Sequence, residues 1–418
     1  MSKLVIEGGV PLCGVVEIQG AKNSILPIIA ATLLADDECE ISNFPDIGDT
    51  HIALEILKAL GANSTIHTNS IIVNAAGAYG TEIPDDLMRK MRSSLMFLGA
   101  ILSKNRRARV SLPGGCDIGT RPVDLHIGAL KEMGVVFSEA HGYMECEAKN
   151  ISPADIVLTY PSVGATENIM LAAAKANGVT TIKNAAKEPE IVDLQNFINA
   201  MGGKIRGAGG SEIIITGVKN LHGVKYSVIP DRIVLSTYMC AVAATRGNAV
   251  FKNVNTSHVS SVLAALSKAG CKIYDLKDTV AIECDRLNAI NSLMSMPYPG
   301  FPTDAGSPFV AMMAGAAGTT LFVETIFENR FRYVGELLRM GAKIKTEGRA
   351  AVIEGQKKLY GAPVEACDLR GGAALVVAAL AAEGITSVSH AEFIERGYEH
   401  IESVLTELGA RIKYEKDV

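Results

Sequence analysis

The sequence MGAKIK at Met340–Lys345 ends a helical pattern and starts a strand pattern. Similar helix-to-strand junctions, each marked by a glycine, recur along the chain. Glycine directly after a helix is a common C-cap, so one such site carries little information. Here, however, an apolar or small residue followed by glycine marks six helix ends in 418 residues. The six glycines are Gly61, Gly134, Gly202, Gly270, Gly341 and Gly409. Their spacings of 73, 68, 68, 71 and 68 residues predict six repeats of about 70 residues.

Each marker glycine is followed by a pattern typical of a β-hairpin. After Gly341, for example, Lys343–Lys345 and Ala351–Gly355 alternate in polarity around a turn. Gly409 lacks a second strand, because the chain ends soon after it. Val5–Gly8 has the same sequence, VIEG, as Val352–Gly355. We therefore predict that the N-terminal segment supplies the missing strand and completes the sixth repeat.

This completion defines the expected domain organisation. Three repeats form a first domain at residues 22–230, which carries the cysteine-containing loop. Residues 1–21 and 231–418 form the second domain, so the chain crosses between the domains twice. We expect the active site in the cleft between the two domains.

Each repeat also contains two helices of different character. One helix is apolar on nearly every face, which is typical of a helix inside a core. These six stretches are Ser24–Ala35, Ser94–Leu102, Ala165–Ala174, Leu235–Ala244, Pro308–Ala317 and Ala373–Ala382. The other helix is amphipathic, as at Asp124–Met133 and Glu399–Leu408. The pattern predicts an α/β (α+β) fold of two domains with three repeats each, in which the helices lie inside and the sheets cover them.

Polar residues occur at the same point of every repeat, directly before the apolar helix. They are Lys22, Asn23, Arg92, Ser162, Arg232, Asp304 and Arg370. Helix N-termini carry partial positive charge and unpaired N–H groups, which attract anions. Arg121 and Arg396 occupy a second shared position, 13 residues before a marker glycine, at the start of the amphipathic helix. If these positions in both domains face a shared cleft, that cleft is predicted to bind small anions that carry phosphate and carboxylate groups. Its cations would be Lys22, Arg92, Arg121, Arg370 and Arg396.

A simpler interpretation exists for each of these residues taken singly. A lone cation is more often a solvated side chain or part of a helix-end salt bridge. Asp304 and Asp368 precede helices, where N-capping is the commonest role of aspartate. The shared position in the repeats, rather than any one residue, favours a binding site.

The segment PGGCDIGTRP at Pro113–Pro122 combines paired glycines, Cys116 and Arg121. Glycines permit a loop that opens and closes over a substrate, and a nearby cation favours the reactive thiolate form of cysteine. A buried, inert cysteine in a turn is the alternative. The polar and flexible neighbours favour a reactive, exposed thiol.

The composition excludes several classes of function. The net charge of −5 gives no sign of binding to nucleic acid or a membrane surface, and no tryptophan is present for base stacking. The eight cysteines and eight histidines show no metal-ligand spacing, so we expect no metal and free thiols in a reducing cytoplasm. The first residues read as a strand rather than a signal peptide, and the longest apolar run, Ala373–Ala382, is too short to span a bilayer. No GxGxxG motif follows a strand, which argues against a dinucleotide-binding dehydrogenase.

The sequence resembles the UDP-N-acetylglucosamine 1-carboxyvinyltransferases, a family of enolpyruvyl transferases, along essentially its whole length. The motifs that carry the resemblance are GAKNS at 20–24, MRSS at 91–94, LPGGC at 112–116, IGTRPVDLH at 118–126, PSVGAT at 161–166, FPTD at 301–304, FENRF at 327–331, DLR at 368–370 and RGY at 396–398. The resemblance implies a two-domain inside-out α/β barrel with three repeats in each domain. It also implies transfer of the enolpyruvyl group of phosphoenolpyruvate to the sugar 3′-hydroxyl, with release of phosphate. It also implies a role in peptidoglycan synthesis, and so in cell wall biogenesis, cell shape and cell division.

The resemblance assigns roles to individual residues. Cys116 would protonate the methylene carbon of phosphoenolpyruvate and can form an adduct at C2, and Asp304 would accept the hydroxyl proton. Lys22, Arg121 and Arg396 would hold phosphate and carboxylate, with Lys22 and Arg396 counted as catalytic. The implied substrate-binding residues are Lys22, Asn23, Arg92, Arg121, Pro122, Val123, Asp124, Leu125, Ser162, Val163, Gly164, Asp304, Ile326, Asp368, Arg370 and Arg396. No cofactor is implied, a monomer is expected, and Cys116 predicts sensitivity to the epoxide antibiotic fosfomycin.

One departure from the family pattern follows Asp304. The family more often shows an aliphatic residue and glutamine there, whereas this chain has AGSP at Ala305–Pro308. We therefore expect a less regular helix start, and a second, less active copy of the enzyme is one interpretation. Two further hypotheses remain: a shikimate-pathway enolpyruvyl transferase, which lacks the cysteine loop, and an inactive binder of sugar nucleotide.

Overall fold

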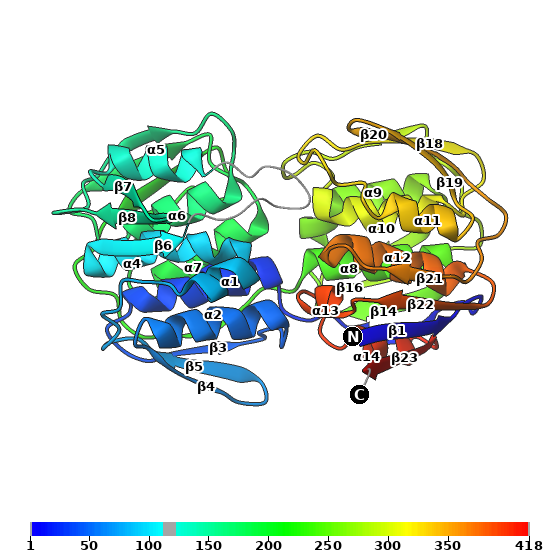
Figure 1. The fold of residues 1–418 in the computed structure, drawn as a ribbon, viewed down its shortest axis with the longest axis horizontal. Helices are drawn as coiled ribbons and strands as arrows, with labels where there is room; N and C mark the ends of the chain where they lie inside the picture. Colours follow the sequence, from blue (N-terminus) through cyan, green and yellow to red (C-terminus); the bar gives the residue numbers. More distant parts are fainter. Residues whose placement is uncertain (1, 112–122, 417–418) are drawn as a thin grey trace. The chain divides into compact units, whose positions relative to one another are not determined.

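The computed structural model describes residues 2–111 and 123–416, and the loop predicted around Cys116 lies outside these residues (Figure 1). The described chain is mixed α/β and divides into two compact units. We call residues 20–111 and 123–229 the middle unit, and residues 2–19 and 230–416 the terminal unit. In the described part of the chain, none of the helices combines the length and apolar character needed to cross a bilayer.

The described strands of the middle unit form three small sheets. Their strand orders are β13-β3-β5-β4, β6-β8-β7 and β11-β12-β10-β9. The strands are β3 (Cys39–Ser42), β4 (Asn63–Ile66), β5 (Ser70–Asn74), β6 (Arg107–Ser111), β7 (Val136–Ala140), β8 (Tyr143–Glu147), β9 (Asp155–Val157), β10 (Val179–Lys183), β11 (Lys204–Arg206), β12 (Glu212–Thr216) and β13 (Lys225–Ser227). Each four-stranded sheet joins one parallel pair to an antiparallel hairpin, as β13 and β3 do beside β5 and β4.

The described strands of the terminal unit form three sheets of four strands each. Their orders are β15-β16-β14-β2, β17-β18-β20-β19 and β21-β22-β1-β23. The strands are β1 (Ser2–Glu7), β2 (Cys13–Glu17), β14 (Asn248–Lys252), β15 (Lys272–Asp275), β16 (Thr279–Glu283), β17 (Ser292–Met294), β18 (Thr319–Val323), β19 (Lys343–Glu347), β20 (Ala350–Glu354), β21 (Pro363–Glu365), β22 (Ile385–Ser389) and β23 (Arg411–Lys416). The hairpin predicted after Gly341 is confirmed as β19 and β20.

The N-terminal strand completes the last hairpin of the chain, as the repeated VIEG sequence predicted. β1 lies antiparallel between β22 and β23, with Glu7 opposite Arg411. The following strand, β2, does not join this sheet. It pairs in parallel with β14, so the first twenty residues serve two sheets rather than the sixth repeat alone.

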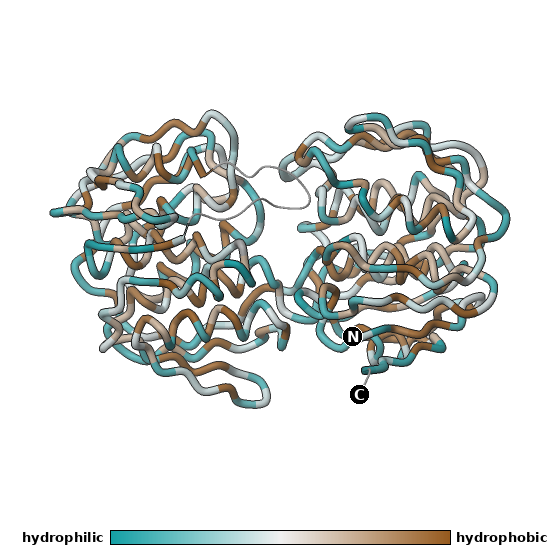
Figure 2. Tube along the Cα trace, viewed as in Figure 1, coloured by the Kyte–Doolittle hydropathy of each residue, from teal (hydrophilic) through white to brown (hydrophobic). Residues whose placement is uncertain are grey.

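Helices and strands both contribute to the buried core of each unit. The helices are α1 (Lys22–Ala31), η1 (Thr32–Leu34), α2 (Gly48–Ala59), α3 (Asp85–Lys90), η2 (Arg92–Met96), α4 (Phe97–Asn105), α5 (Asp124–Glu132), α6 (Val163–Ala173), α7 (Pro189–Ala200), α8 (Arg232–Ala244), η3 (Thr256–Val259), α9 (Ser260–Lys268), α10 (Thr303–Met313), α11 (Val334–Arg339), α12 (Leu369–Ala381), α13 (Glu392–Glu395) and α14 (Ile401–Glu407). In α8 and α12 nearly every side chain is buried, as expected for helices that are apolar on all faces. Figure 2 shows this as brown segments inside each unit, against teal hairpin tips.

The central helices begin earlier than the sequence pattern indicated. Of the polar residues predicted to precede them, Ser162 is indeed an N-cap. Arg92 begins η2, the short helix directly before α4. The others lie within the first turn: Lys22 and Asn23 in α1, Arg232 in α8, Asp304 in α10 and Arg370 in α12. Asp231 and Asp368 cap α8 and α12 just upstream by accepting backbone N–H bonds. The prediction was wrong because hydropathy marks the buried face of a helix and not its first residue.

The expected irregularity after Asp304 is also absent. α10 runs as an α-helix from Thr303 through Pro308 to Met313. Pro308 is the sixth residue of the helix, so its missing N–H removes only one early bond. A β-carbon on Gly306 would come 2.8 Å from Cζ of Phe322, so the small residue lets the helix lie close against that ring.

Candidate functional site

Asp304 is held by two buried arginines in the terminal unit. Arg330 Nη2 lies 2.7 Å from Asp304 Oδ1, and Arg370 Nη2 lies 3.3 Å from Oδ2. The arginine side chains are 3% and 4% exposed, whereas that of Asp304 is 27% exposed. The carboxylate is therefore fixed at both oxygens while it remains open to a ligand. The N-capping interpretation of Asp304 is wrong, because it lies inside α10 and makes no cap bond.

Asp368 and Arg370 occupy adjacent positions at the start of α12. Asp368 Oδ1 accepts the backbone N–H groups of Arg370 and Gly371, both at 2.9 Å, so here the capping interpretation is confirmed. The Arg370 guanidinium lies 5.4 Å from the centre of the Tyr398 ring. The cap on one side and the ring on the other place Arg370 against Asp304.

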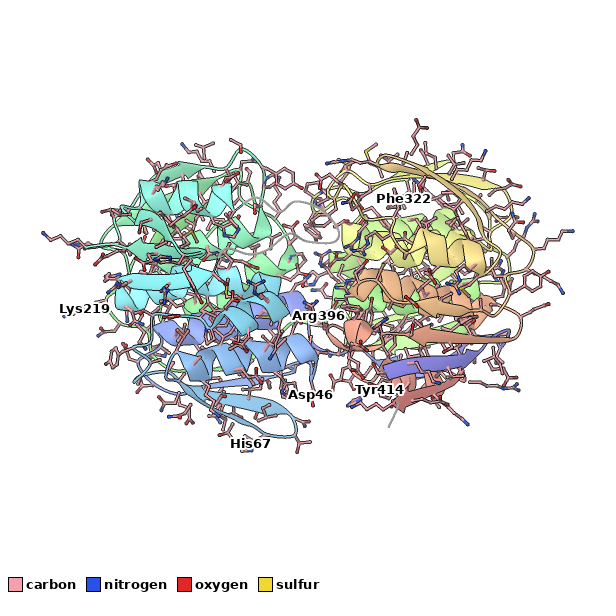
Figure 3. The ribbon with its side chains drawn as sticks, in the orientation of Figure 1. Asp46, His67, Lys219, Phe322, Arg396 and Tyr414 are labelled. Carbon is pink, nitrogen blue, oxygen red and sulfur yellow. The ribbon has the colours of Figure 1, made fainter. Side chains whose placement is uncertain are left out.

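Arg396 lies at the end of a short helix and not at the start of an amphipathic one. It is the C-cap of α13, whereas α14 begins at Ile401, so the prediction of its helical position was wrong. Gln19 fixes the residues that follow it: its Nε2 donates to Gly397 O at 3.3 Å, and its Oε1 accepts Glu399 N–H at 2.8 Å. Figure 3 labels the half-buried Arg396 beside α13.

Ile326 lies in the loop between β18 and α11, which also contains Arg330. The fully buried carboxylate of Glu324 accepts the backbone N–H groups of Ile326 at 2.7 Å and Phe327 at 3.1 Å. Within the terminal unit, the loop of Ile326 and the Asp304 carboxylate are therefore joined through Arg330, which lies further along this loop and contacts Asp304.

Lys22 is paired with a buried aspartate in the middle unit. Its Nζ lies 2.7 Å from Asp49 Oδ2, and the two side chains are 10% and 1% exposed. The neighbouring Asn23 is half-buried. Ser24 hydrogen-bonds to Asp193, which also accepts the backbone N–H of Ile229 at 3.3 Å. These bonds fix the first turn of α1, where Lys22 and Asn23 lie.

His126 and Asn168 join two of the predicted substrate-binding segments. His126 Nδ1 lies 2.8 Å from Asn168 Nδ2, and a β-carbon on Gly164 would come 3.0 Å from Cε1 of the His126 ring. The first turn of α5, with Val123, Asp124 and Leu125, therefore packs on the start of α6, with Ser162, Val163 and Gly164. Asn168 Nδ2 also donates to Leu95 O at 3.0 Å, which ties the helix beginning at Arg92 to the same place.

Burial keeps the His126 ring neutral. Desolvation lowers its pKa from 6.5 to about 4. The neutral ring accepts at Nδ1 from the Asn168 amide, because an amide nitrogen can only donate. Its position therefore depends on the uncharged form.

Three predicted site residues, Cys116, Arg121 and Pro122, lie outside the described residues. Among the residues that the structure does describe, no group of three or more His, Cys, Asp or Glu side chains is arranged to hold a metal ion.

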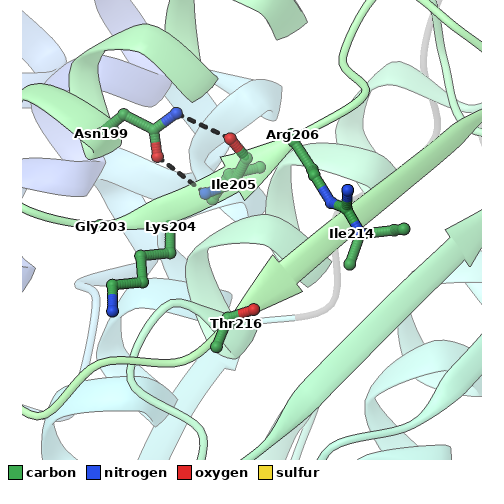
Figure 4. Close-up of a pocket in the computed structure, with 7 residues that line it drawn as sticks. All are labelled: Asn199, Gly203, Lys204, Ile205, Arg206, Ile214 and Thr216. Atoms are coloured by element: carbon green, nitrogen blue, oxygen red, sulfur yellow. Dashed lines mark hydrogen bonds between the residues drawn. The ribbon is translucent and has the colours of Figure 1, made fainter.

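A separate cavity of about 290 Å³ lies on the sheet of β11 and β12 (Figure 4). None of the predicted site residues lines it. At its rim the Asn199 side chain donates to Ile205 O at 2.7 Å and accepts Ile205 N–H at 2.8 Å. The amide thus satisfies the backbone of the edge strand β11, which protects this edge from pairing with another chain.

Sequence reasoning missed the partners of the predicted residues. Arg330, Glu324, Asp49, His126 and Asn168 were not among the candidates, although each orders one of them. Arg330 and His126 stand inside the quoted motifs FENRF and IGTRPVDLH, which was the available signal. No sequence signal marked Asp49 or Glu324, because a buried carboxylate on a helix or after a strand has no distinctive spacing.

The two units and their residues place the chain in a known class of transferase. A model of the EPSP synthase family, 3-phosphoshikimate 1-carboxyvinyltransferase, matches residues 6–405. The chain belongs to this family.

Individual similar proteins carry more specific names than the family model does. A protein of Caldanaerobacter subterraneus subsp. tengcongensis named UDP-N-acetylglucosamine 1-carboxyvinyltransferase 2 is 50% identical over 413 residues, 99% of each chain. A protein of Thermotoga maritima named UDP-N-acetylglucosamine 1-carboxyvinyltransferase is 45% identical over 416 residues, again 99% of each. The crystal structure of the enolpyruvyl transferase NikO from Streptomyces tendae is 26% identical, with a TM-score of 0.89 over 99% of this chain and 98% of that one. The resemblance read from the motifs is confirmed.

Proposed function

We propose that this protein transfers the enolpyruvyl group of phosphoenolpyruvate to the 3′-hydroxyl of UDP-N-acetylglucosamine. The products are UDP-N-acetyl-3-O-(1-carboxyvinyl)-glucosamine and phosphate, and the reaction is the first committed step of peptidoglycan synthesis. The observation that carries the proposal is 50% identity over 99% of both chains to a protein named for this activity. The Asp304 carboxylate, fixed by two arginines yet partly open, fits the base that such a transfer needs.

The proposed reaction is an addition followed by an elimination. Cys116 delivers a proton to the methylene carbon of phosphoenolpyruvate, which leaves positive charge at C2, and the sugar oxygen attacks C2 as Asp304 takes the hydroxyl proton. Loss of a proton from the same methyl carbon and of phosphate from C2 then restores the double bond. Lys22, Arg121 and Arg396 hold the phosphate and carboxylate groups through this sequence.

Residues of both units are proposed to serve this one reaction. The sugar nucleotide is assigned to Asn23, Arg92, Arg121–Leu125, Ser162–Gly164, Asp304 and Ile326, and phosphoenolpyruvate to the side of Asp368 and Arg370. In support, the hydrogen bonds of His126 and Asn168 join the segments of α5 and α6, and Asp304 contacts Arg370 directly.

The finer description of the fold belongs to the same proposal. We propose six repeats arranged as two inside-out barrels, with helices inside and sheets outside. The three sheets in each described unit and the nearly complete burial of α8 and α12 support it. A cytoplasmic location is supported by the cysteines of the described chain, which are all free thiols.

The experiment is a coupled phosphate-release assay with phosphoenolpyruvate and each of two acceptors, UDP-N-acetylglucosamine and shikimate 3-phosphate. We expect release with the sugar nucleotide, lost by at least about 100-fold in Cys116→Ser because general acid catalysis contributes about that much. Cys13→Ser changes an exposed cysteine and serves as the matched control. Fosfomycin should inactivate the wild type and Cys13→Ser alike, by alkylating Cys116.

Three outcomes would contradict the proposal. Release with shikimate 3-phosphate alone would assign the chain to the shikimate-pathway reaction. Binding of the sugar nucleotide without turnover would indicate a regulatory binder. Full activity of Cys116→Ser would remove the cysteine from the mechanism.

A further inference from the structure

Glu324 is a carboxylate with no exposed surface, directly after β18. A buried carboxylate is costly unless its oxygens are hydrogen-bonded. Glu324 accepts four bonds, from Ser295 Oγ at 2.9 Å, Thr303 Oγ1 at 2.8 Å, Ile326 N at 2.7 Å and Phe327 N at 3.1 Å. These four donors come from three separate stretches of the chain, so the carboxylate joins them at one point.

Two of these stretches carry proposed site residues. Thr303 directly precedes Asp304 in the first turn of α10, and Ile326 lies in the loop after β18. Glu324 is the link between them at one end of the loop. Further along the loop, Arg330 Nη2 donates to Asp304 Oδ1 at 2.7 Å and to Thr303 O at 3.3 Å.

The loop and the start of α10 are therefore connected at two points by the side chains of Glu324 and Arg330. The loop base is tied independently: Thr325 Oγ1 donates to Ser295 O at 2.6 Å, and Arg349 Nη1 donates to Thr325 O at 2.6 Å. A catalytic group needs such support to stay within about 0.5 Å of its working geometry.

We propose that Glu324 is a positioning residue for enolpyruvyl transfer. It holds the first turn of α10, with Asp304, in a fixed relation to the loop that carries Ile326. Glu324 acts through hydrogen bonds and not through its charge, and it touches neither substrate nor the reacting atoms. This inference rests on the proposed function for its kinetic consequences.

The first experiment isolates the link from Glu324 to the base. Thr303→Val removes the hydroxyl that Glu324 accepts and keeps the shape of the side chain, and Thr303→Ser keeps the hydroxyl. We expect Thr303→Val to lower kcat about tenfold with KM for UDP-N-acetylglucosamine within about twofold, because the loop contacts remain. Thr303→Ser should stay within about twofold of the wild type. Glu347→Gln, an exposed glutamate on β19, is the control for unrelated changes of the same unit.

The second experiment separates hydrogen bonding from charge. Glu324→Ala should lower kcat by about 100-fold and raise KM for the sugar nucleotide, since both links are lost. Glu324→Gln should stay within about fivefold of the wild type. Its amide oxygen can still accept from Ile326 and Phe327, and its NH₂ can donate to Thr303 Oγ1.

A third measurement does not depend on turnover. In hydrogen exchange, the Ile326 and Phe327 amides should be protected in the wild type and in Glu324→Gln, and should exchange at least about tenfold faster in Glu324→Ala. Equal exchange in all three proteins would overturn the proposal.

The kinetic outcomes distinguish failure of the proposed function from failure of the positioning role of Glu324. If the wild type fails to turn over, the proposed function fails, while the exchange data still decide whether Glu324 orders the loop. If the wild type is active but Thr303→Val keeps its kcat, or Glu324→Gln is as impaired as Glu324→Ala, the positioning role is wrong. Should Glu324→Ala not fold, the Thr303 pair gives the decision.

Discussion

The ion pairs at the starts of α1 and α10 use opposite arrangements. In α1 the first turn carries a cation, Lys22, held by one buried carboxylate, Asp49. In α10 the first turn carries an anion, Asp304, held by the two buried arginines Arg330 and Arg370. A helix N-terminus favours a negative group, so Asp304 follows the helix dipole while Lys22 opposes it.

This difference fits the different roles that the proposed function gives to Lys22 and Asp304. A lysine at a helix N-terminus gains nothing from the helix dipole, and Lys22 is stabilised by Asp49; the proposed function gives it a negatively charged ligand as well. Asp304 gains from the helix and from both arginines, and its remaining exposure leaves it able to meet a hydroxyl. The predictions below test this contrast, in order of decreasing expected effect.

Asp304→Asn should give the largest change. The amide keeps the shape but cannot accept a proton, and the loss of a general base costs about 10²- to 10⁴-fold in rate. The measurement is kcat for phosphate release, with Asp278→Asn, at an exposed aspartate of the same unit, as control. Activity within tenfold of the wild type would show that Asp304 is not the base. The ion pair in α10 would then have no catalytic role to set against that of Lys22.

Asp49→Asn should mainly destabilise the protein. It leaves the nearly buried Lys22 ammonium without its carboxylate, and breaking a buried ion pair typically costs about 3–5 kcal/mol. Urea denaturation measures the loss. The double variant Lys22→Met/Asp49→Leu should regain most of the stability while it stays inactive. If the double variant is no more stable than Asp49→Asn, the cost does not come from the unpaired charge.

Gly306→Ala should be the next largest effect. Two residues after Lys22 and after Asp304 the units differ again: α1 has Ser24 bonded to Asp193, whereas α10 has Gly306 packed on Phe322. The added methyl group would meet Cζ of Phe322 at 2.8 Å, and overpacking of a core costs about 1–3 kcal/mol. The matched control is Gly335→Ala in α11, where the β-carbon meets no atom within 4 Å and the change should be neutral or slightly stabilising. Equal unfolding free energies of the two variants would contradict the close packing of α10.

The smallest effect near neutral pH concerns His126 in the middle unit. Its folded-state pKa is lowered to about 4 by burial, below the unfolded value of 6.5. The unfolded chain therefore binds the proton first, so this contribution to stability is complete above pH 6.5 and is lost as the pH falls from 6.5 towards 4. At pH 6 the loss should be about 1 kcal/mol or less.

His126→Asn removes the titrating group and should flatten this part of the pH profile in urea denaturation. His258→Asn, which removes a histidine of the terminal unit, serves as the comparison. A profile of His126→Asn with the wild-type slope between pH 6.5 and 4 would contradict a buried, neutral His126.

Much of the fold was predictable from the sequence because its signals are local. The marker glycines located the hairpins, the apolar stretches located the buried helices, and the VIEG sequence located the partner of β23. Helix starts were misplaced because N-caps such as Asp231 and Asp368 depend on individual hydrogen bonds.

The sequence indicated where the candidate residues lie in the fold, but it did not indicate their pairings. The repeat position identified Lys22, Asp304 and Arg370, since all three fall at helix starts. Their partners Asp49 and Arg330 lie 27 and 26 residues along the chain, on elements that meet them only in the folded unit. Periodicity indicates which face of a helix is buried, but not which side chain of another element contacts it.

The placement of β1 between β22 and β23 has a consequence for synthesis of the chain on the ribosome. The middle unit has all of its strands once Ile229 has emerged, so it can fold while translation continues. β1 precedes the middle unit in the chain, but its neighbours β22 and β23 are made only after that unit, at Ile385–Ser389 and Arg411–Lys416. Until then β1 is an unpaired strand that carries Leu4, Val5 and Ile6, and an unpaired strand edge in a partly made chain is prone to aggregate.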